Sequence, residues 1–279
     1  MYSQAAPYFA AVTEGKTKAL VPEAIIGLAL ATLSMGDIEK AYQHFREISA
    51  LYPAYKTHPR YMLPLGLIQW EVRKYQGALD YLLRDDRNPA SRYFSGLCYR
   101  ELKMFPEASG AFRRITQEFP ESVWADRARF ELGETFYLQG DYLLASQTFG
   151  DIFRSHRTKQ WDYLSLYRLA CCDVRMKKYS SAEERLWTLN QSKLDPALAA
   201  NVNYLLTESL ATQDKISKIV GILEQVPARK RTPENNYRII WARAAQGIPE
   251  SGEASQPVLE RAGRSGTNAP HAPASGLRL

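Results

Sequence analysis

The sequence predicts an all-α fold in which short helix–turn–helix units follow one another. Apolar residues recur at helical spacing, glycine-containing turns separate them, and the whole pattern repeats along the chain. The clearest unit lies in residues 119–156, where Gly140-Asp141 marks the turn. Its first helix presents Phe130, Leu132, Gly133, Phe136 and Tyr137, and its second presents Tyr142, Ala145, Phe149 and Ile152.

Small residues in the predicted second helices give the period. They are Ala41, Ala78, Ala108, Ala145 and Ala182, with separations of 37, 30, 37 and 37 residues. A bulky residue follows each by four positions: Phe45, Leu82, Phe112, Phe149 and Leu186. A small residue precedes each in the first helix: Ala29, Gly66, Gly96, Gly133 and Ala170. Because a small residue facing a large one lets two helices approach closely, the pattern predicts five tightly packed helix pairs.

This pattern resembles the tetratricopeptide repeat, a helix–turn–helix unit of about 34 residues. The likeness extends from Pro22 to Pro196, with prolines placed after most of the second helices. It implies an all-α superhelix, or solenoid, of five to six repeats with a C-terminal capping helix. The longer units are expected to carry their extra residues in the loops between repeats. The unit of 30 residues implies a shortened second helix near Leu82–Asn88.

The expected organisation has four parts. Residues 1–21 are predicted to form a capping helix or a truncated half-repeat, and residues 22–196 the five repeats. Residues 197–247 are predicted to form a degenerate repeat and a capping helix. Residues 248–279 have few bulky apolar side chains and are expected to be disordered.

Pro64 affects where the first helix of the second repeat is expected to begin. A proline costs about 3 kcal/mol in a helix interior but little in the first turn, so this helix is predicted to start near Tyr61.

Composition and motifs argue against an enzyme. The histidines are scattered over separate repeats, and no phosphate-binding loop, metalloprotease motif or nucleophile elbow is present. The three cysteines, Cys98, Cys171 and Cys172, are interpreted as buried structural thiols. We therefore expect no catalytic residue, no cofactor and no metal site. No apolar run is long enough to predict a membrane span.

In tetratricopeptide proteins the first helices line an inner groove, and the resemblance carries this role to matching positions here. The predicted partner-binding groove consists of Arg60, Leu63, Leu67, Trp70, Tyr93, Arg100, Arg127, Phe130, Tyr137, Tyr167 and Arg175. Tyrosine, tryptophan and arginine are the residue types that dominate protein interfaces. The Lys/Asn set that grips a C-terminal carboxylate in chaperone-binding members is missing from these positions. The alternative is that several of these residues pack between repeats.

The predicted function is that of a non-enzymatic scaffold that binds a peptide or helix segment of another protein. Residues 119–149 are similar in style to repeats of bacterial envelope proteins, such as the barrel-assembly lipoprotein and the Tol–Pal coordinator. That similarity implies a role in envelope or secretion-machinery assembly. Two compartments stay open: the periplasm or cell envelope if a signal segment lies upstream, and the cytoplasm otherwise.

A nucleic-acid-binding or regulatory helical-repeat protein is the alternative function. The formal net charge of +6 and the isoelectric point of about 9.1 permit an acidic partner without requiring nucleic acid. The arginine-rich surface of this alternative would consist of Arg84, Arg87, Arg92, Arg113, Arg114 and the Arg229-Lys230-Arg231 run. Binding that falls steeply with salt would favour nucleic acid, and salt-tolerant binding would favour the scaffold.

Overall fold

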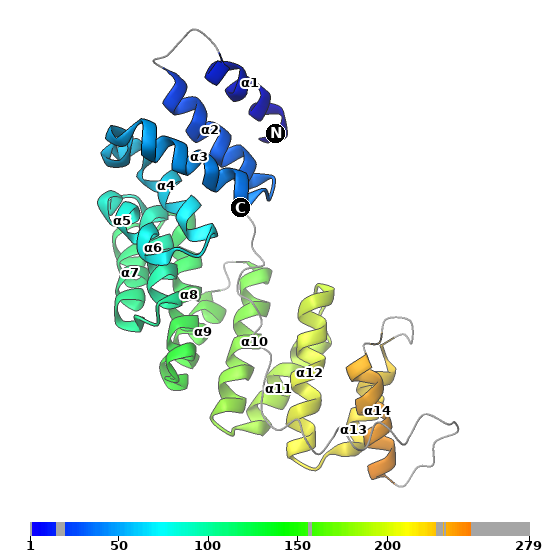
Figure 1. Cartoon of the computed structure of the whole chain (residues 1–279). Helices are drawn as coiled ribbons and strands as arrows, with labels where there is room; N and C mark the ends of the chain where they lie inside the picture. Colours follow the sequence, from blue (N-terminus) through cyan, green and yellow to red (C-terminus); the bar gives the residue numbers. More distant parts are fainter. Residues whose placement is uncertain (1, 15–19, 156–157, 227–230, 232, 247–279) are drawn as a thin grey trace. The chain divides into compact units, whose positions relative to one another are not determined.

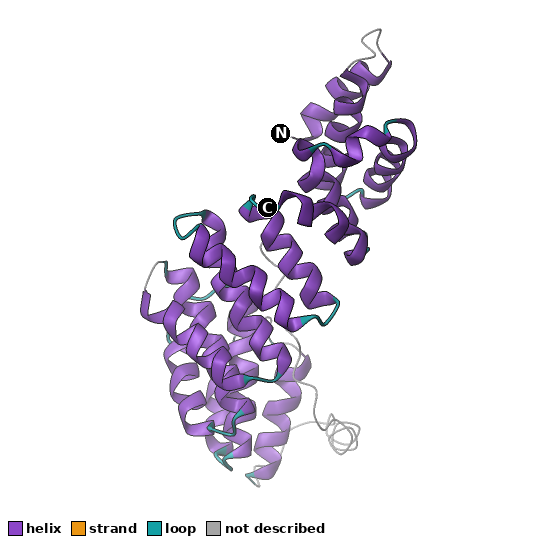
Figure 2. Ribbon diagram, turned by 90° about the vertical axis from the view of Figure 1, so that its left-hand side faces the viewer, coloured by secondary structure: helices purple, strands orange, loops and turns teal. Residues whose placement is uncertain are grey.

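The computed structural model confirms the all-α prediction (Figures 1 and 2). It describes residues 2–14, 20–155, 158–226, 231 and 233–246, and within these ranges there are helices and loops but no strand. The chain divides into two compact units, Met1–Thr148 and Phe149–Leu279. Each unit is a series of helices in which neighbours along the chain contact each other. The expected tail, residues 248–279, lies outside the described residues.

Unit 1 contains the first three predicted repeats and the fourth as far as the middle of its second helix. Its elements are α1 (Tyr2–Glu14), α2 (Val21–Ser34), α3 (Ile38–Leu51), η2 (Pro53–Thr57), α4 (Pro59–Glu71), α5 (Tyr75–Leu82), η3 (Leu83–Asp85), α6 (Pro89–Glu101), α7 (Phe105–Glu118), α8 (Val123–Gln139) and the start of α9 (Tyr142–Ser155). The first helices of successive repeats also contact each other directly, α2 with α4, α4 with α6 and α6 with α8. This contact brings the predicted groove positions of α4, α6 and α8 onto adjoining helices.

Capping side chains and left-handed turns explain where several helices begin and end. Asn88 accepts a hydrogen bond from the Ala90 amide, and Ser122 accepts one from the Trp124 amide. The turns after α2 and α8 use Gly36 and Gly140, with φ of +85° and +91°. These two glycines supply a backbone conformation that other residues adopt only with strain.

The predicted small-to-large contacts are present in the second and third repeats. A Cβ atom added to Gly96 would lie 2.7 Å from the Phe112 ring, and one added to Gly66 would lie 2.6 Å from the Leu82 side chain. The second-helix alanines of the repeats, Ala78, Ala108 and Ala145 among them, are fully buried. Close helix–helix approach therefore depends on a missing side chain in one helix and a large one in the other.

Replacing Gly96 with alanine tests this packing. The added methyl group would overlap the buried Phe112 ring, so we expect the free energy of unfolding to fall by about 1–3 kcal/mol. The matched control is Gly110→Ala in α7, where an added Cβ meets no atom within 4 Å. That control should gain up to about 1 kcal/mol from helix propensity. Equal effects at both sites in urea unfolding would contradict the packing.

Several boundaries differ from those predicted. The first helix of the second repeat is α4. The prediction that it begins near Tyr61 is wrong, because α4 begins at Pro59 and holds Pro64 in its interior. Pro59 has its φ fixed near the helical value, which suits the first position of a helix. The shortened second helix is confirmed: α5 ends at Leu82 and η3 follows it.

The expectation that the longer units carry their extra residues in loops is confirmed between repeats one and two, where η2 lies between α3 and α4. It is wrong for the next two longer units, whose first helices α8 and α10 have 17 residues each, against 13 in α6. The N-terminal segment forms α1, which packs against α2. The Phe9 ring occupies the space beside Gly27, where an added Cβ would lie 2.7 Å from it.

Unit 2 contains the fifth repeat and the helices after it. Its complete helices are α10 (Lys159–Arg175), α11 (Tyr179–Asn190), α12 (Pro196–Thr212), α13 (Ile216–Glu224) and α14 (Pro233–Ala245). The pair Ala182 and Leu186 is fully buried, as the repeat register predicts. Helix α10 also contacts α12, so the pairing of first helices seen in unit 1 continues within this unit.

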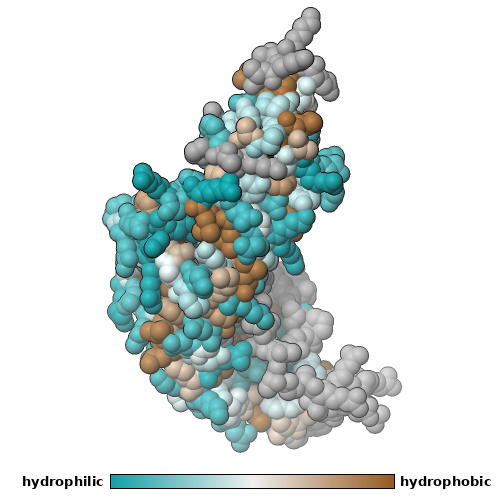
Figure 3. Space-filling view, turned by 60° about the vertical axis from the view of Figure 1, so that its left-hand side comes forward, coloured by the Kyte–Doolittle hydropathy of each residue, from teal (hydrophilic) through white to brown (hydrophobic). Residues whose placement is uncertain are grey.

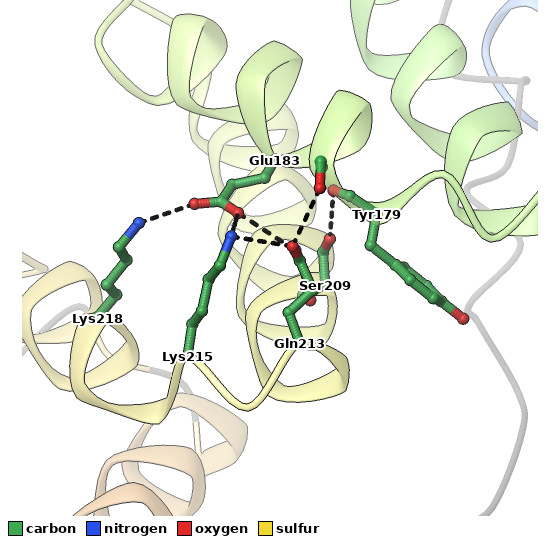
Figure 4. Close-up of polar contacts among 7 residues, drawn as sticks. Tyr179, Glu183, Ser209, Gln213, Lys215 and Lys218 are labelled. Carbon is green, nitrogen blue, oxygen red and sulfur yellow. Dashed lines mark hydrogen bonds and ion pairs between the residues drawn. The ribbon is translucent and has the colours of Figure 1, made fainter.

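A polar network centred on Glu183 joins α11 to the turn between α12 and α13 (Figure 4). The Glu183 carboxylate accepts hydrogen bonds from Lys215 Nζ at 2.6 Å, Lys218 Nζ at 3.0 Å and Gln213 Nε2 at 3.2 Å. Burial alone would raise the pKa of the Glu183 carboxyl. The hydrogen bonds and charges of the two lysines outweigh that effect and lower this pKa to about 2.

The Glu183 network predicts a pH-dependent contribution to stability. A carboxyl whose pKa is lower in the folded chain stabilises it above the unfolded value of 4.5, and this contribution disappears as pH falls toward about 2. Glu183→Gln should therefore cost about 1–2 kcal/mol at pH 7, a modest value because both lysines are partly exposed. Urea unfolding of both proteins should converge between pH 5 and pH 2. If the difference in unfolding free energy between the two proteins stays constant over this window, the Glu183 network is not its cause.

Candidate functional site

The candidate site is the first-helix face of unit 1. We use this name for the predicted groove residues of α4, α6 and α8, namely Leu63, Leu67, Trp70, Tyr93, Arg100, Arg127, Phe130 and Tyr137. Arg60 also lies in α4, but its side chain is outside the described residues. The remaining predicted groove residues, Tyr167 and Arg175, lie on α10 in unit 2; Tyr167 is 9% exposed and Arg175 is exposed.

Aromatic rings from four helices, α4, α6, α7 and α8, form a cluster at this face. The Trp70 ring lies 5.4 Å from the Phe94 ring, centroid to centroid, in an edge-to-face arrangement. The Tyr93 ring lies 5.0 Å from the Trp124 ring and 5.8 Å from the Phe112 ring. Tyr93, which is a predicted groove residue, therefore also takes part in the contact between the two helices of its repeat. The large side chain of Phe112 extends past Gly96 and reaches the ring one turn away.

A buried ion pair connects α6 to α8 across the same face. Arg100 Nη1 donates to one oxygen of Glu131, and the Tyr93 hydroxyl donates to the other oxygen at 3.2 Å. The side chains of Arg100 and Glu131 are only 10% and 8% exposed. Burial lowers the pKa of the Arg100 guanidinium, but contact with Glu131 outweighs this and holds the pKa above its ordinary value. Burial and the neighbouring Glu131 both raise the pKa of Tyr93.

The members of the first-helix face differ in how accessible they are. Tyr93 and Phe130 are 8% and 9% exposed, so they contribute mainly to packing between helices. Leu63, Leu67, Trp70, Arg127 and Tyr137 are half-buried. Leu63, Leu67 and Trp70 pack with their inner parts against the core cluster of α5–α7. This second group presents the apolar and aromatic surface that a partner could contact. The face seen in Figure 3 is mixed, with apolar patches separated by hydrophilic side chains.

A family model described as the tetratricopeptide repeat matches residues 93–122, which cover most of α6, all of α7 and the following turn. Together with the stacked helix pairs and their small-to-large contacts, this match decides the architecture. The chain has the tetratricopeptide-repeat fold. No curated protein matches the sequence.

Solved tetratricopeptide-fold structures are similar to the chain over most of its length. A tetratricopeptide repeat protein from Parabacteroides merdae has a TM-score of 0.60 and 18% identity, over 86% of this chain and 96% of that one. The apo form of the quorum sensor NprR from B. thuringiensis has a TM-score of 0.59 and 14% identity, over 88% and 77%. Pseudomonas aeruginosa pilF has a TM-score of 0.53 and 18% identity, over 82% and 100%. At these identities the similarity establishes the fold alone.

In this tetratricopeptide fold, arginines proposed for nucleic-acid binding already have structural roles. Arg92 is buried, pairs with Glu118 and lies 5.5 Å from the Phe119 ring. Arg113 lies 5.5 Å from the Phe136 ring. Residues 229 and 230 are outside the described residues, and Arg231 donates to backbone carbonyls of Val226 and Glu224. Arg84, Arg87, Arg113 and Arg114 are the exposed members of the predicted surface.

The cysteines and the acidic residues add no reactive site to the part of the chain that the structure describes. All three cysteine side chains are buried, and burial raises the pKa of the Cys98 thiol to about 12. Within the described ranges, no group of three His, Cys, Asp or Glu side chains could hold a metal ion. Among the helices that are described, none combines the length and apolar composition needed to cross a membrane.

Two residues central to the face were missed by sequence reasoning. Glu131 was not selected because charged residues are seldom buried, yet it connects Arg100 to Tyr93. Trp124 is absent from the predicted groove, although its ring contacts those of Tyr93 and Phe94. The sequence holds a signal for Trp124: Ser122 is a typical N-cap residue, and a helix that begins after it has Trp124 in its first turn.

Proposed function

We propose that the chain is a protein-interaction scaffold that binds a segment of another protein along the first-helix face of unit 1. The observation that carries the proposal is the direct contact between α4, α6 and α8. As a result, five half-buried side chains lie on adjoining helices: Leu63, Leu67, Trp70, Arg127 and Tyr137. Half-buried aromatic and arginine side chains are held in place by their neighbours and so lose little entropy on binding.

Support also comes from a protein of the same fold. NprR has been solved in complex with its cognate peptide NprX, with a TM-score of 0.51 to this chain and 15% identity. Binding of an extended or helical segment is the corresponding proposal here. The envelope-like style of residues 119–149 makes bacterial envelope and secretion-machinery proteins the first place to look for the partner.

Paired measurements of affinity and stability test this proposal. Trp70→Ala and Tyr137→Ala should each weaken partner binding by about 2 kcal/mol or more at the best site, while lowering the urea midpoint less than Tyr93→Ala does. Tyr93→Ala is the control, because that side chain is buried against Phe112 and Trp124. Unchanged affinity in both face variants would show that the partner uses another surface.

The salt dependence of binding separates the scaffold from the nucleic-acid alternative. We expect affinity for the protein partner to change little between low and moderate salt. Binding to nucleic acid would instead fall with a log–log slope of several units.

A further inference from the structure

Two buried N–H donors on the first-helix face have no acceptor. The Trp70 indole Nε1 and the Arg100 Nε are both buried without a hydrogen-bond partner. A buried polar group without a partner destabilises the folded chain, so such groups are rare in native structures. Two of them therefore need an explanation.

The two donors occupy equivalent places in neighbouring repeats. Trp70 follows Gly66 by four residues, and Arg100 follows Gly96 by four residues. Each glycine lies against the large side chain of its own second helix, so the two repeats share one register. Because α4 and α6 contact each other, the two positions are separated by about one interhelical distance, roughly 8–10 Å. In an extended peptide, acceptors two or three residues apart are separated by about 7–10 Å.

The charges around Arg100 indicate which acceptor fits. Arg100 is already paired with Glu131, and the buried Glu134 also acts electrostatically on it. Arg127 lies over the Trp124 ring, 5.3 Å from its centroid. The exposed Glu101 also acts electrostatically on Arg100, so the two arginines and three glutamates carry a formal charge of −1. A carboxylate would gain no net attraction here and would have to approach two buried carboxylates, whereas a neutral carbonyl would not.

We propose that Trp70 Nε1 and Arg100 Nε donate to neutral amide carbonyls of an extended partner segment. The carbonyls belong to the backbone or to Asn or Gln side chains two or three residues apart. This inference rests on the proposed function and names the chemistry that the first-helix face recognises. The proposal requires the half-buried Trp70 side chain and the Arg100 side chain to shift as the segment binds, so that both donors reach its carbonyls. Both donors are already buried in the free chain, so they lose no water contacts when they donate hydrogen bonds to the segment.

The experiment uses linear peptides selected from a displayed random library against the full chain. Trp70→Phe removes the indole donor and keeps an aromatic ring against Phe94, and Arg100→Lys removes Nε and keeps a cation beside Glu131. Each variant should weaken the selected peptides about three- to tenfold, as expected for one hydrogen bond. The indole N–H proton resonance assigned by Trp70→Phe should also move downfield when peptide is added. Trp187→Phe, which makes the same change at a half-buried tryptophan of a second helix, α11, is the matched control and should leave affinity unchanged.

Leu67→Glu separates failure of this inference from failure of the proposed function. If Leu67→Glu abolishes binding but Trp70→Phe and Arg100→Lys do not weaken it, the face binds peptides and the donors are not used. Enrichment of Asp or Glu over Asn and Gln in the selected peptides would overturn the neutral-carbonyl chemistry. If no peptide is selected, or if binding is indifferent to Leu67→Glu as well, both the proposed function and this inference are wrong.

Discussion

Replacing Arg100 with methionine should lower the free energy of unfolding by about 3–5 kcal/mol, because it leaves Glu131 buried without its cation. Methionine keeps much of the side-chain volume, so the loss reports the charge rather than a cavity. The Tyr93 hydroxyl still donates to Glu131 but does not neutralise it. Urea unfolding followed by circular dichroism measures the change.

The double variant Arg100→Met, Glu131→Met is the control for this prediction. It removes both charges, so it should recover most of the lost stability and could equal the parent. The two single variants and the double variant form a cycle that isolates the interaction energy of the pair. If the double variant is as unstable as the sum of the single variants, the pair contributes no coupling and the interpretation of the α6–α8 connection is wrong.

Replacing Phe112 with alanine should also cost about 3–5 kcal/mol. Its side chain is fully buried, fills the space beside Gly96 and contacts the Tyr93 ring. The variant removes these contacts and leaves a cavity between the two helices of the third repeat. Phe105→Ala in the first turn of α7 is the matched control, because Phe105 is only half-buried and should cost much less.

A second substitution strengthens the Phe112 test. Gly96→Ala adds a methyl group at the place that Phe112→Ala empties, so the double variant should be more stable than Phe112→Ala alone. If Gly96→Ala lowers stability equally with and without the Phe112 ring, the two residues are not in contact.

The contacts within repeats were predictable because they depend on local periodicity. Gly96 precedes Ala108 by twelve positions, and Phe112 follows Ala108 by four. This local spacing predicts the contact between Gly96 and Phe112 without reference to any other repeat. The turn glycines and the shortened α5 follow from the same local signals. Helix starts were less well predicted, since α4 begins at Pro59 and not near Tyr61, and α8 and α10 are longer than the first helix of the third repeat, α6.

The candidate site was harder to predict because it depends on contacts between repeats. Tyr93 and Glu131 are far apart in sequence and meet only through the packing of α6 against α8. The repeat pattern predicted which positions share a register, but it could not predict which of these side chains are buried against neighbouring helices. Tyr93 and Phe130 turned out to be buried, whereas Leu67 and Trp70 keep part of their surface.

Site-specific photo-crosslinking tests the central claim most directly. Leu67 on the first-helix face and Arg114, an exposed residue of the second helix α7, would each be replaced by benzoylphenylalanine. A partner isolated by affinity capture from the native organism would then be irradiated with each variant. Binding along the first-helix face predicts a covalent adduct from position 67 and none from position 114. An adduct from position 114 alone, or equal yields from both positions, would contradict the claim.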